Sequence, residues 1–322
     1  MQSVLKRSSL AVVRWFDSWA GTANDKQATD PKAGEKTSID WGRVVPFIAL
    51  HLSCLFVFVV GWSWTAIIAA VGMYYLRMFA ITAGYHRYFS HRSFKTPRVG
   101  QFCLAVLGAS AAQRGPLWWA AHHRHHHEHS DQPDDLHSPT QRGFFWSHVG
   151  WFLSKRNFRT RIERVKDLAA YPELRWLDRY DVAVPIVFAL ALFAFGGALE
   201  AFAPGLGTNA WQMLVWGFFV STVVLYHGTF TINSLAHGWG SRRFETKDDS
   251  RNNLWLALLT MGEGWHNNHH HAPGTARQGF RWWEVDASYY LLKGLERIGV
   301  VRNLRPIPAG VQATLDAEGD AR

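Results

Sequence analysis

Histidines gather in three short groups along this chain, and imidazole is the side chain that most often ligates transition metals. Seventeen of the 322 residues are histidine. The groups read HRYFSH from His86 to His91, HRHHH from His123 to His127, and HNNHH from His266 to His270. One HxxxxH can arise by chance, but HxxxxH followed by two HxxHH groups predicts a metal centre.

Helical geometry explains the spacing within the second and third groups. Successive residues of an α-helix turn by about 100°, so His123, His126 and His127 fall within one sector. His266, His269 and His270 repeat this arrangement. Asn233 and His237, four residues apart, would add a ligand and a polar group from another helix. His125, in contrast, is expected to point about 150° away from its neighbours.

The number and type of these side chains indicate which metal would bind. Eight or more imidazoles exceed what one four-coordinate zinc ion uses, so the count predicts two ions. A nitrogen-rich shell with open positions suits iron in O₂ chemistry, whereas zinc has no redox change to offer. Isolated histidines elsewhere, His51, His137, His148 and His227, are interpreted as ordinary hydrogen-bonding residues.

Four apolar segments outside these groups predict transmembrane helices. They cover residues 44–62, 65–83, 182–202 and 212–232, each close to the roughly 20 residues that cross a bilayer. The segment from Phe102 to Gln113 is too short, and we expect it to be re-entrant, interfacial or buried. The predicted fold class is therefore an all-α integral membrane protein with four transmembrane helices and a cytoplasmic helical cap that holds a histidine-rich diiron site.

Charge gives the orientation and the segment boundaries. The net charge is +9, yet neither short hairpin loop contains Lys or Arg, while residues 87–179 are rich in both. The positive-inside rule then predicts that the long loop, all three histidine groups and both termini are cytoplasmic. We expect a cytoplasmic segment 1–43 with an interfacial helix, a membrane domain 44–302 and a loose tail 303–322. No aromatic-basic motif accompanies the charge, so nucleic acid is not expected as a partner.

The motifs resemble the membrane fatty-acyl desaturase family, in particular the acyl-CoA delta-9 desaturase branch and its bacterial members. The family's HxxxxH, HxxHH and HxxHH boxes match in order and spacing over about residues 40–305, and Asn233-Ser-Leu-Ala-His237 matches the branch's extra Asn and His. At one place the chain departs from the family's pattern, and this difference bears on recognition of the substrate headgroup. Animal acyl-CoA desaturases carry Arg-Asp before the second box, whereas this chain has Ala121-His122.

The resemblance implies a ligand set. The iron ligands would be His86, His91, His123, His126, His127, His237, His266, His269 and His270, with Asn233 acting through a water. His122, His125, His129 and His271 fall outside the matching positions, and we expect them to support the ligands or to face solvent. Aromatic and small residues near the inner ends of the spans could line the acyl channel or merely anchor the interface: Tyr85, Trp118, Trp119, Thr229 and Trp265.

The resemblance also implies an activity in fatty acid biosynthesis. Two iron ions would use O₂ and two electrons to introduce a cis double bond, at delta-9, into an acyl-CoA or a phospholipid acyl chain. The chain has no haem-attachment, ferredoxin or dinucleotide motif, so electrons are expected from a separate ferredoxin, rubredoxin or cytochrome with its reductase. The expected location is the bacterial inner membrane.

Two other functions compete with desaturation. A membrane diiron hydroxylase of lipids or alkanes would use a similar histidine core but would place oxygen on carbon. A metal transporter or sensor is the alternative from another class. Transport sites usually lie along a polar path inside the spans. These histidine groups lie at the membrane face instead, which argues against a transporter.

Overall fold

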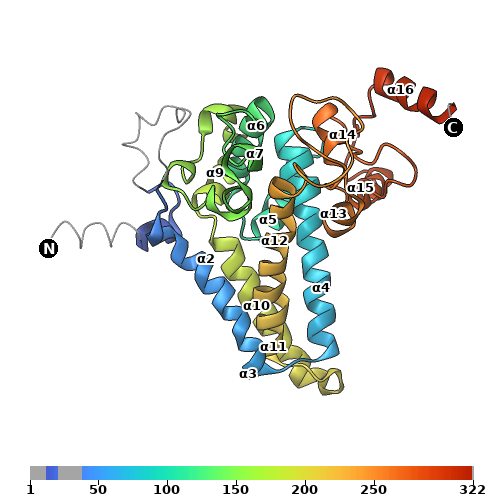
Figure 1. Cartoon of the computed structure of the whole chain (residues 1–322). Helices are drawn as coiled ribbons and strands as arrows, with labels where there is room; N and C mark the ends of the chain where they lie inside the picture. Colours follow the sequence, from blue (N-terminus) through green and yellow to red (C-terminus); the bar gives the residue numbers. More distant parts are fainter. Residues whose placement is uncertain (1–11, 21–37, 321–322) are drawn as a thin grey trace.

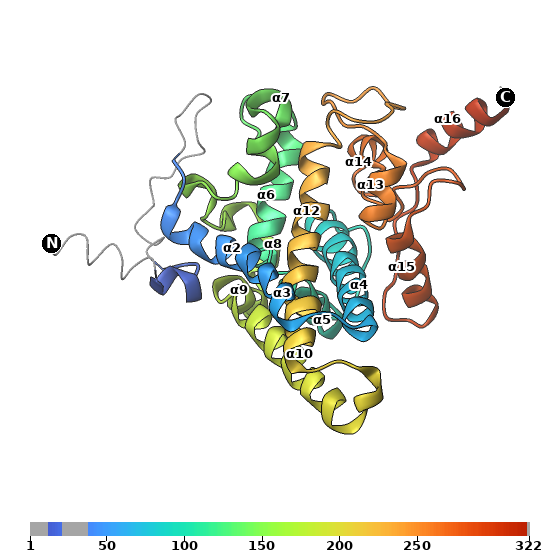
Figure 2. The ribbon, with the colours of Figure 1, turned by 60° about the horizontal axis from the view of Figure 1, so that its bottom comes forward.

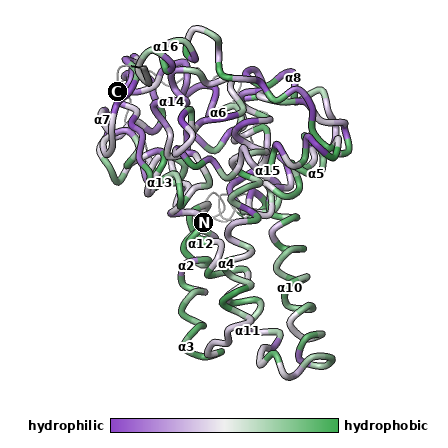
Figure 3. The backbone as a smooth tube through the Cα atoms, turned by 90° about the vertical axis from the view of Figure 1, so that its right-hand side faces the viewer, coloured by the Kyte–Doolittle hydropathy of each residue, from purple (hydrophilic) through white to green (hydrophobic). Residues whose placement is uncertain are grey.

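The computed structural model describes residues 12–20 and 38–320. Within these residues the regular structure is helical, and β pairing occurs only as isolated bridges. Figure 1 shows two parts, a set of long helices and a cap of shorter helices and loops above it. In Figure 3 the long helices are coloured mainly hydrophobic, and most hydrophilic segments lie in the cap. This division is the one expected for a membrane part and a polar part.

Three helices in the described residues are long and apolar enough to cross a membrane: Trp64–Ser90, Ala183–Phe202 and Ala210–Ser234. They correspond to the predicted spans 65–83, 182–202 and 212–232. The predicted first span, 44–62, is a shorter apolar helix, Val44–Val60. Gly61, at φ 66°, ends it in a backbone conformation that suits glycine.

The long helices are built from several segments. The first apolar helix comprises α2 (Trp41–Ser53), a 3₁₀ turn η1 (Cys54–Phe56) and α3 (Val57–Val60). The next joins α4 (Trp64–Phe79) to the π-helix η2 (Ala80–Ser90). The last pair is α10 (Ala183–Phe202) and a helix made of α11 (Ala210–Leu214), the π-helical η7 (Val215–Val220) and α12 (Ser221–Ser234). Figures 1 and 2 show this last helix between α2 and α4, and η7 contacts both.

The cap is formed by short helices from two parts of the chain, residues 98–179 and 254–320. The first is α5 (Arg98–Ala109), a short apolar helix that overlaps the segment Phe102 to Gln113 expected to be re-entrant, interfacial or buried. It is followed by α6 (Pro116–His129), α7 (Pro139–Arg142), η3 (Trp146–Gly150), η4 (Lys155–Asn157), η5 (Ile162–Arg164), α8 (Lys166–Ala169) and α9 (Pro172–Arg179). The connection after α10 contains η6 (Pro204–Leu206), outside the cap. The C-terminal part adds α13 (Leu254–Leu259), α14 (His266–His271), α15 (Ala287–Arg297) and α16 (Ala309–Asp320).

The π-helix η2 is the centre around which the cap assembles. It packs against α5, α6 and α15. Its residues Tyr85 and Phe89 are fully buried in the main apolar core together with Leu117 of α6 and Leu177 of α9. The end of the second long helix is thereby fixed between segments that are distant in sequence.

Short helices lie near both ends of the part of the chain that the structure describes. The segment 303–322, expected as a loose tail, contains α16, and Leu315 of this helix is buried beside Phe244, Ala272 and Phe280. The predicted interfacial helix of the N-terminal segment lies mostly outside the described residues. Its described portion is helical over residues 12–16, where Val12, Val13 and Phe16 are exposed.

Candidate metal centre

Nine histidines, the same nine that the family boxes indicate, lie in two adjoining groups. Within each group one ligand atom per residue lies within 4.8 Å of all the others. The five-histidine site consists of His86, His91, His123, His127 and His269. The four-histidine site consists of His126, His237, His266 and His270. Two sites of nitrogen donors are what a pair of metal ions requires.

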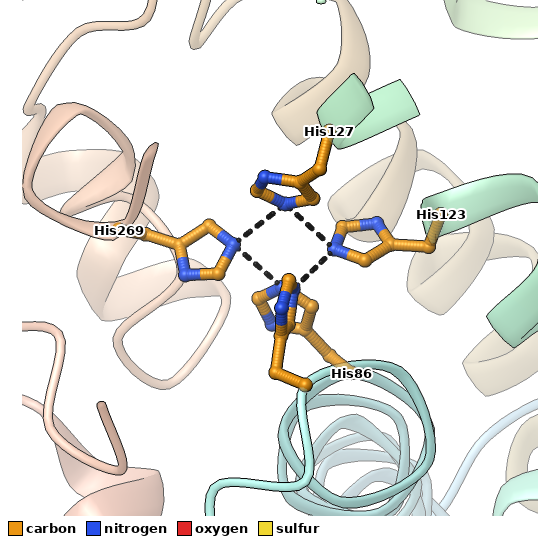
Figure 4. A group of neighbouring side chains, drawn as sticks. His86, His123, His127 and His269 are labelled. Atoms are coloured by element: carbon orange, nitrogen blue, oxygen red, sulfur yellow. Dashed lines mark hydrogen bonds between the residues drawn. The ribbon is translucent and has the colours of Figure 1, made fainter. Parts of the chain in front are cut away.

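In the five-histidine site the Nε2 atoms face a common centre. Figure 4 shows His86, His123, His127 and His269 arranged around it. The Nε2 atom of His127 lies 3.0 Å from that of His123 and 2.9 Å from that of His269. The Nε2 atoms of His86 and His269 are 3.0 Å apart, and those of His91 and His123 are 2.8 Å apart. Imidazole nitrogens at such spacing would all reach one ion.

The π-helix explains how a five-residue spacing can serve one site. In an α-helix, residues five apart are separated by about 140° around the axis. In η2 the backbone N–H of His91 donates to the carbonyl of His86 at 3.2 Å, which is the i to i+5 bond of a π-turn. The two rings consequently lie with their centroids 4.9 Å apart.

Helix α6 divides its histidines between the two sites. His123 and His127 join the five-histidine site, and His126 joins the other. Helix α14 does the same, with His269 in the first site and His266 and His270 in the second. The HxxHH spacing therefore supplies both sites at once from each helix.

The neighbouring histidines outside the boxes have other contacts. His125 is buried, and its Nε2 lies 3.0 Å from the carbonyl of Asp134. The Nδ1 of His122 lies 2.8 Å from the carbonyl of Trp118, and the Nδ1 of His129 lies 3.1 Å from the carbonyl of His125. His271 is exposed and stacks on Phe244. None of these four rings belongs to the two sites.

The donor atoms fit a metal pair. The Nε2 atoms of His126 and His270 are buried without a hydrogen-bond partner. Burial, together with neighbouring histidines, holds the pKa of His123, His127 and His269 well below the usual value, and burial lowers the pKa of His270 to about 4. These imidazoles are therefore neutral at physiological pH, and the neutral form is the one that ligates metal.

Carboxylates behind the histidines are the functional residues that the sequence did not reveal. Asp131 lies 2.7 Å from the Nδ1 of His237, Asp135 lies 3.0 Å from the Nδ1 of His126, and Asp248 lies 2.8 Å from the Nδ1 of His270. Such contacts fix the tautomer so that Nε2 is free for a metal. Asp131 and Asp135 closely follow the second box, and that proximity was the available signal. Asp248 stands far from any box.

The five-histidine site has a different support. Glu263 contacts the Nδ1 of His86, and the fully buried Arg87 holds Glu263 at 3.2 Å and Asp286 at 2.9 Å. The side-chain amide nitrogen of Gln278 donates to Glu263 at 3.2 Å. This buried network ties the end of η2 to the segment that follows α14.

Known proteins identify this arrangement. A sequence model of the family described as fatty acid desaturase matches residues 46–301. The chain belongs to the fatty acid desaturase family. It is 37% identical over 273 residues to the sn-1 stearoyl-lipid 9-desaturase of Anabaena variabilis, covering 84% of this chain and 95% of the relative. It is 35% identical to the sn-2 palmitoyl-lipid 9-desaturase of a Nostoc species, covering 87% and 95%.

The resemblance stated from the histidine boxes is thus confirmed, and this desaturase is an oxygen-dependent oxidoreductase. A third relative, the acyl-CoA C20 Delta5-desaturase of Anemone leveillei, is 35% identical and covers 80% of this chain and 78% of its own length. Relatives named for acyl-lipids and for acyl-CoA therefore share the sequence pattern. Family membership alone does not select between these substrates.

A cavity in the desaturase leads to both histidine sites. Its apolar lining includes Met78, Ile81, Trp119 and Ile232, and its polar lining includes Thr82, Thr229, Asn233 and Thr260. His86 and His123 of one site and His126 and His266 of the other border it. An acyl chain in this cavity would have both sites beside it.

Two of the five residues suggested for the acyl channel line this cavity, namely Trp119 and Thr229. The other three do not. The indole N–H groups of Trp118 and Trp265 donate to the carbonyls of Asn157 and Val285, at 2.7 and 2.9 Å. Tyr85 is fully buried beside Trp119. Helix α6 turns the adjacent Trp118 and Trp119 to different sides, and only Trp119 faces the cavity.

The remaining polar residues of interest occupy several places. Asn233 lines the cavity. Its role as a metal ligand through a water stays a prediction. His227 contacts both His51 and His148, at 3.2 and 3.0 Å, away from the two sites. The ring of His137 lies 4.2 Å from that of His126, and these two residues form a third, smaller group with Asp135.

Proposed function

We propose that this desaturase introduces a cis double bond at the delta-9 position of acyl chains in membrane lipids, using two iron ions. The observation that carries the proposal is the apolar cavity that borders both histidine sites. The nine histidines would hold the ions, with Asn233 reaching one of them through a water. When bound, the iron pair would supply the oxidation by O₂ that removes two hydrogens from the chain.

The protein's own residues would select the reacting carbons by position. Methylene groups offer no polar feature for recognition, so the cavity must hold one pair of carbons near the sites by shape. Met78, Ile81 and Ile232 would contact the acyl chain and exclude water. Trp119 lies beside His123, with ring centroids 5.0 Å apart, and would hold the chain against that site.

A lipid-bound substrate is favoured over acyl-CoA by two observations. The relatives from Anabaena variabilis and Nostoc are named for acyl-lipids. In addition, Ala121 and His122, which stand where animal acyl-CoA desaturases have Arg-Asp, are both buried and place no cation there for a CoA phosphate.

The membrane arrangement that we propose has four crossings. The helix Val44–Val60 would cross with the three longer ones, because its apolar length of 17 residues is at the lower limit for a span. The cap and both termini would then be cytoplasmic, in the inner membrane of a bacterium. Electrons would come from a separate ferredoxin, rubredoxin or cytochrome at the cap.

The test is expression in a bacterial host that lacks unsaturated fatty acids, followed by gas chromatography with mass spectrometry of derivatised lipids. The expected product is a delta-9 monoene in the phospholipid fraction, two hydrogens lighter than its precursor. His123→Ala, matched for membrane content, should give none. A product one oxygen heavier would instead indicate hydroxylation, and purified protein with one iron per chain, or active with zinc, would contradict the diiron centre.

A lipid-bound substrate is tested separately with purified, iron-loaded protein. Supplied with a chemical reductant and O₂, it should desaturate phospholipid in vesicles and leave free acyl-CoA unchanged. Conversion of acyl-CoA alone would contradict the lipid assignment without affecting the iron assignment.

A further inference from the structure

Acidic side chains are distributed unequally behind the two histidine sites. In the four-histidine site, three of the four imidazoles have a carboxylate on Nδ1: Asp135 on His126, Asp131 on His237 and Asp248 on His270. In the five-histidine site only His86 has one, which is Glu263. Among the described residues, no carboxylate contacts the Nδ1 atoms of His91, His123 or His127.

The three carboxylates of the four-histidine site keep their full charge because their other partners are neutral. Asp131 accepts from the hydroxyl of Ser138 at 2.6 Å and from the backbone N–H of Asp249 at 2.8 Å. Asp135 accepts from the backbone N–H groups of Asp131 and His137, at 2.9 and 3.2 Å.

Asp248 accepts from the hydroxyl of Thr246 and the backbone N–H of Ser250, both at 3.0 Å. Across the described residues, no Lys or Arg pairs with Asp131, Asp135 or Asp248.

The single carboxylate behind the five-histidine site is largely offset. The guanidinium of Arg87, itself fully buried, lies 3.2 Å from Glu263 and 2.9 Å from Asp286. These three groups together have one net negative charge, whereas the other site faces three. The difference acts in a buried region, where charges interact more strongly than in water.

We infer that an iron ion in the four-histidine site would have a lower reduction potential than one in the five-histidine site, so that the first electron given to the oxidised pair would enter the five-histidine site. A carboxylate on Nδ1 makes imidazole a stronger donor, and nearby negative charge favours the higher oxidation state. One electron from an external one-electron donor would reduce ferric to ferrous iron in the five-histidine site and would leave the ion in the other site ferric. The inference rests on the proposed diiron function.

The first test is a redox titration of the purified, iron-loaded protein without O₂, followed by Mössbauer and electron paramagnetic resonance spectroscopy. We expect two separate one-electron steps and, after one electron per chain, one ferrous and one ferric iron in distinct sites. Uptake of both electrons in a single step would overturn the inference. Lipid desaturation is assayed on the same sample, so active protein with equal potentials would contradict only this inference.

The second test assigns the steps with a matched pair of variants. Asp248→Asn removes the charge behind His270. The second midpoint potential should therefore rise by about 59 mV or more, which is a tenfold change in the one-electron equilibrium constant, while the first midpoint potential stays unchanged. Asp249→Asn is the control. Asp249 is the neighbour of Asp248, but its carboxylate contacts Thr140 rather than a histidine. It should leave both midpoints unchanged. A rise in the first midpoint of Asp248→Asn would overturn the assignment.

Weakened iron binding in Asp248→Asn still gives a decisive result. If that variant keeps one iron, the remaining ion belongs to the five-histidine site and must be reduced at the first midpoint of the unsubstituted protein. Reduction at the second midpoint would overturn the inference. Asp248→Glu, which keeps the charge, should recover the second iron.

Discussion

At the scale of single residues, the two sites depend on which nitrogen of each imidazole is free. Burial alone does not distinguish ligands from their neighbours, because His125 and His126 are adjacent on α6 and equally buried, at 2% exposure each. His126 has Nδ1 on Asp135 and Nε2 without a partner, whereas the Nε2 of His125 lies against the carbonyl of Asp134. Their roles should differ accordingly.

Substituting these two residues tests that difference directly. His126→Ala removes a ligand, so iron affinity and desaturation should fall by at least about 100-fold, which is the upper end of the loss seen when only an outer partner of a ligand is removed. His125→Ala should keep two irons and most activity but lose about 1–3 kcal/mol of stability, because it leaves a buried carbonyl without its partner. Iron content, activity and thermal unfolding are measured at matched expression. Equal loss of iron in both variants would refute the assignment within this box.

At the scale of elements, the sequence indicated which segments are helices and which histidines share a helix face. Apolar length located the segments at 182–202 and 212–232 to within a few residues. It did not reveal that the second helix continues to Ser90 as a π-helix, because i to i+5 bonding leaves no distinct apolar period. The support from Asp248 and Glu263 depends on chain folding between distant segments, which residue spacing does not encode.

The turn between α13 and α14 shows how tightly one element positions a ligand. A Cβ on Gly264 would lie 2.1 Å from the backbone N of Ala257 and 2.5 Å from the backbone O of Asn253. These are main-chain atoms of α13 and its N-cap, so they cannot move aside as a flexible side chain could. His266 follows only two residues later. Glycine at this position therefore lets the third box approach α13.

A pair of glycine substitutions tests this positioning. Gly264→Ala should destabilise the protein by about 1–3 kcal/mol through overpacking and should weaken iron binding in the four-histidine site. Gly294→Ala, inside α15 with no atom within 4 Å of its Cβ, should be neutral or stabilising by up to about 1 kcal/mol. Unfolding temperature and iron per chain are compared for both. Retention of two irons by a stable Gly264→Ala protein would contradict the role of this turn.

At the scale of the whole molecule, the proposed orientation places the cap and the hairpin loops on opposite sides of the membrane. Gln132 after α6 and Gly205 in η6 are both exposed and mark the two sides. In a protein whose Cys54 and Cys103 are replaced by Ala, a membrane-impermeant thiol reagent added from the periplasm should label Gly205→Cys and not Gln132→Cys. The reverse pattern would invert the proposed topology.

The concentration of neutral imidazoles in the cap should also make the stability of the whole molecule sensitive to pH. Burial, together with nearby histidines, lowers the pKa of His91, His123 and His269 well below the value near 6.5 of the unfolded chain. Between these two pKa values the unfolded state binds more protons than the folded state, so acidification favours unfolding. Burial lowers the pKa of His126, but the contact with Asp135 raises it above its usual value. His126 therefore opposes the trend of the other three.

The expected result is a fall in the unfolding temperature of metal-free protein as the pH decreases from 7.5 to 5.5. Each buried neutral histidine contributes roughly 1 kcal/mol per pH unit below 6.5, so several of them should lower the midpoint by at least about 5 °C. Tryptophan fluorescence of protein in detergent with a chelator measures it. Iron-loaded protein is the control, and its decline should begin at lower pH because bound metal competes with protons. A midpoint that is constant or rises on acidification would show that these imidazoles are not held neutral in the folded cap.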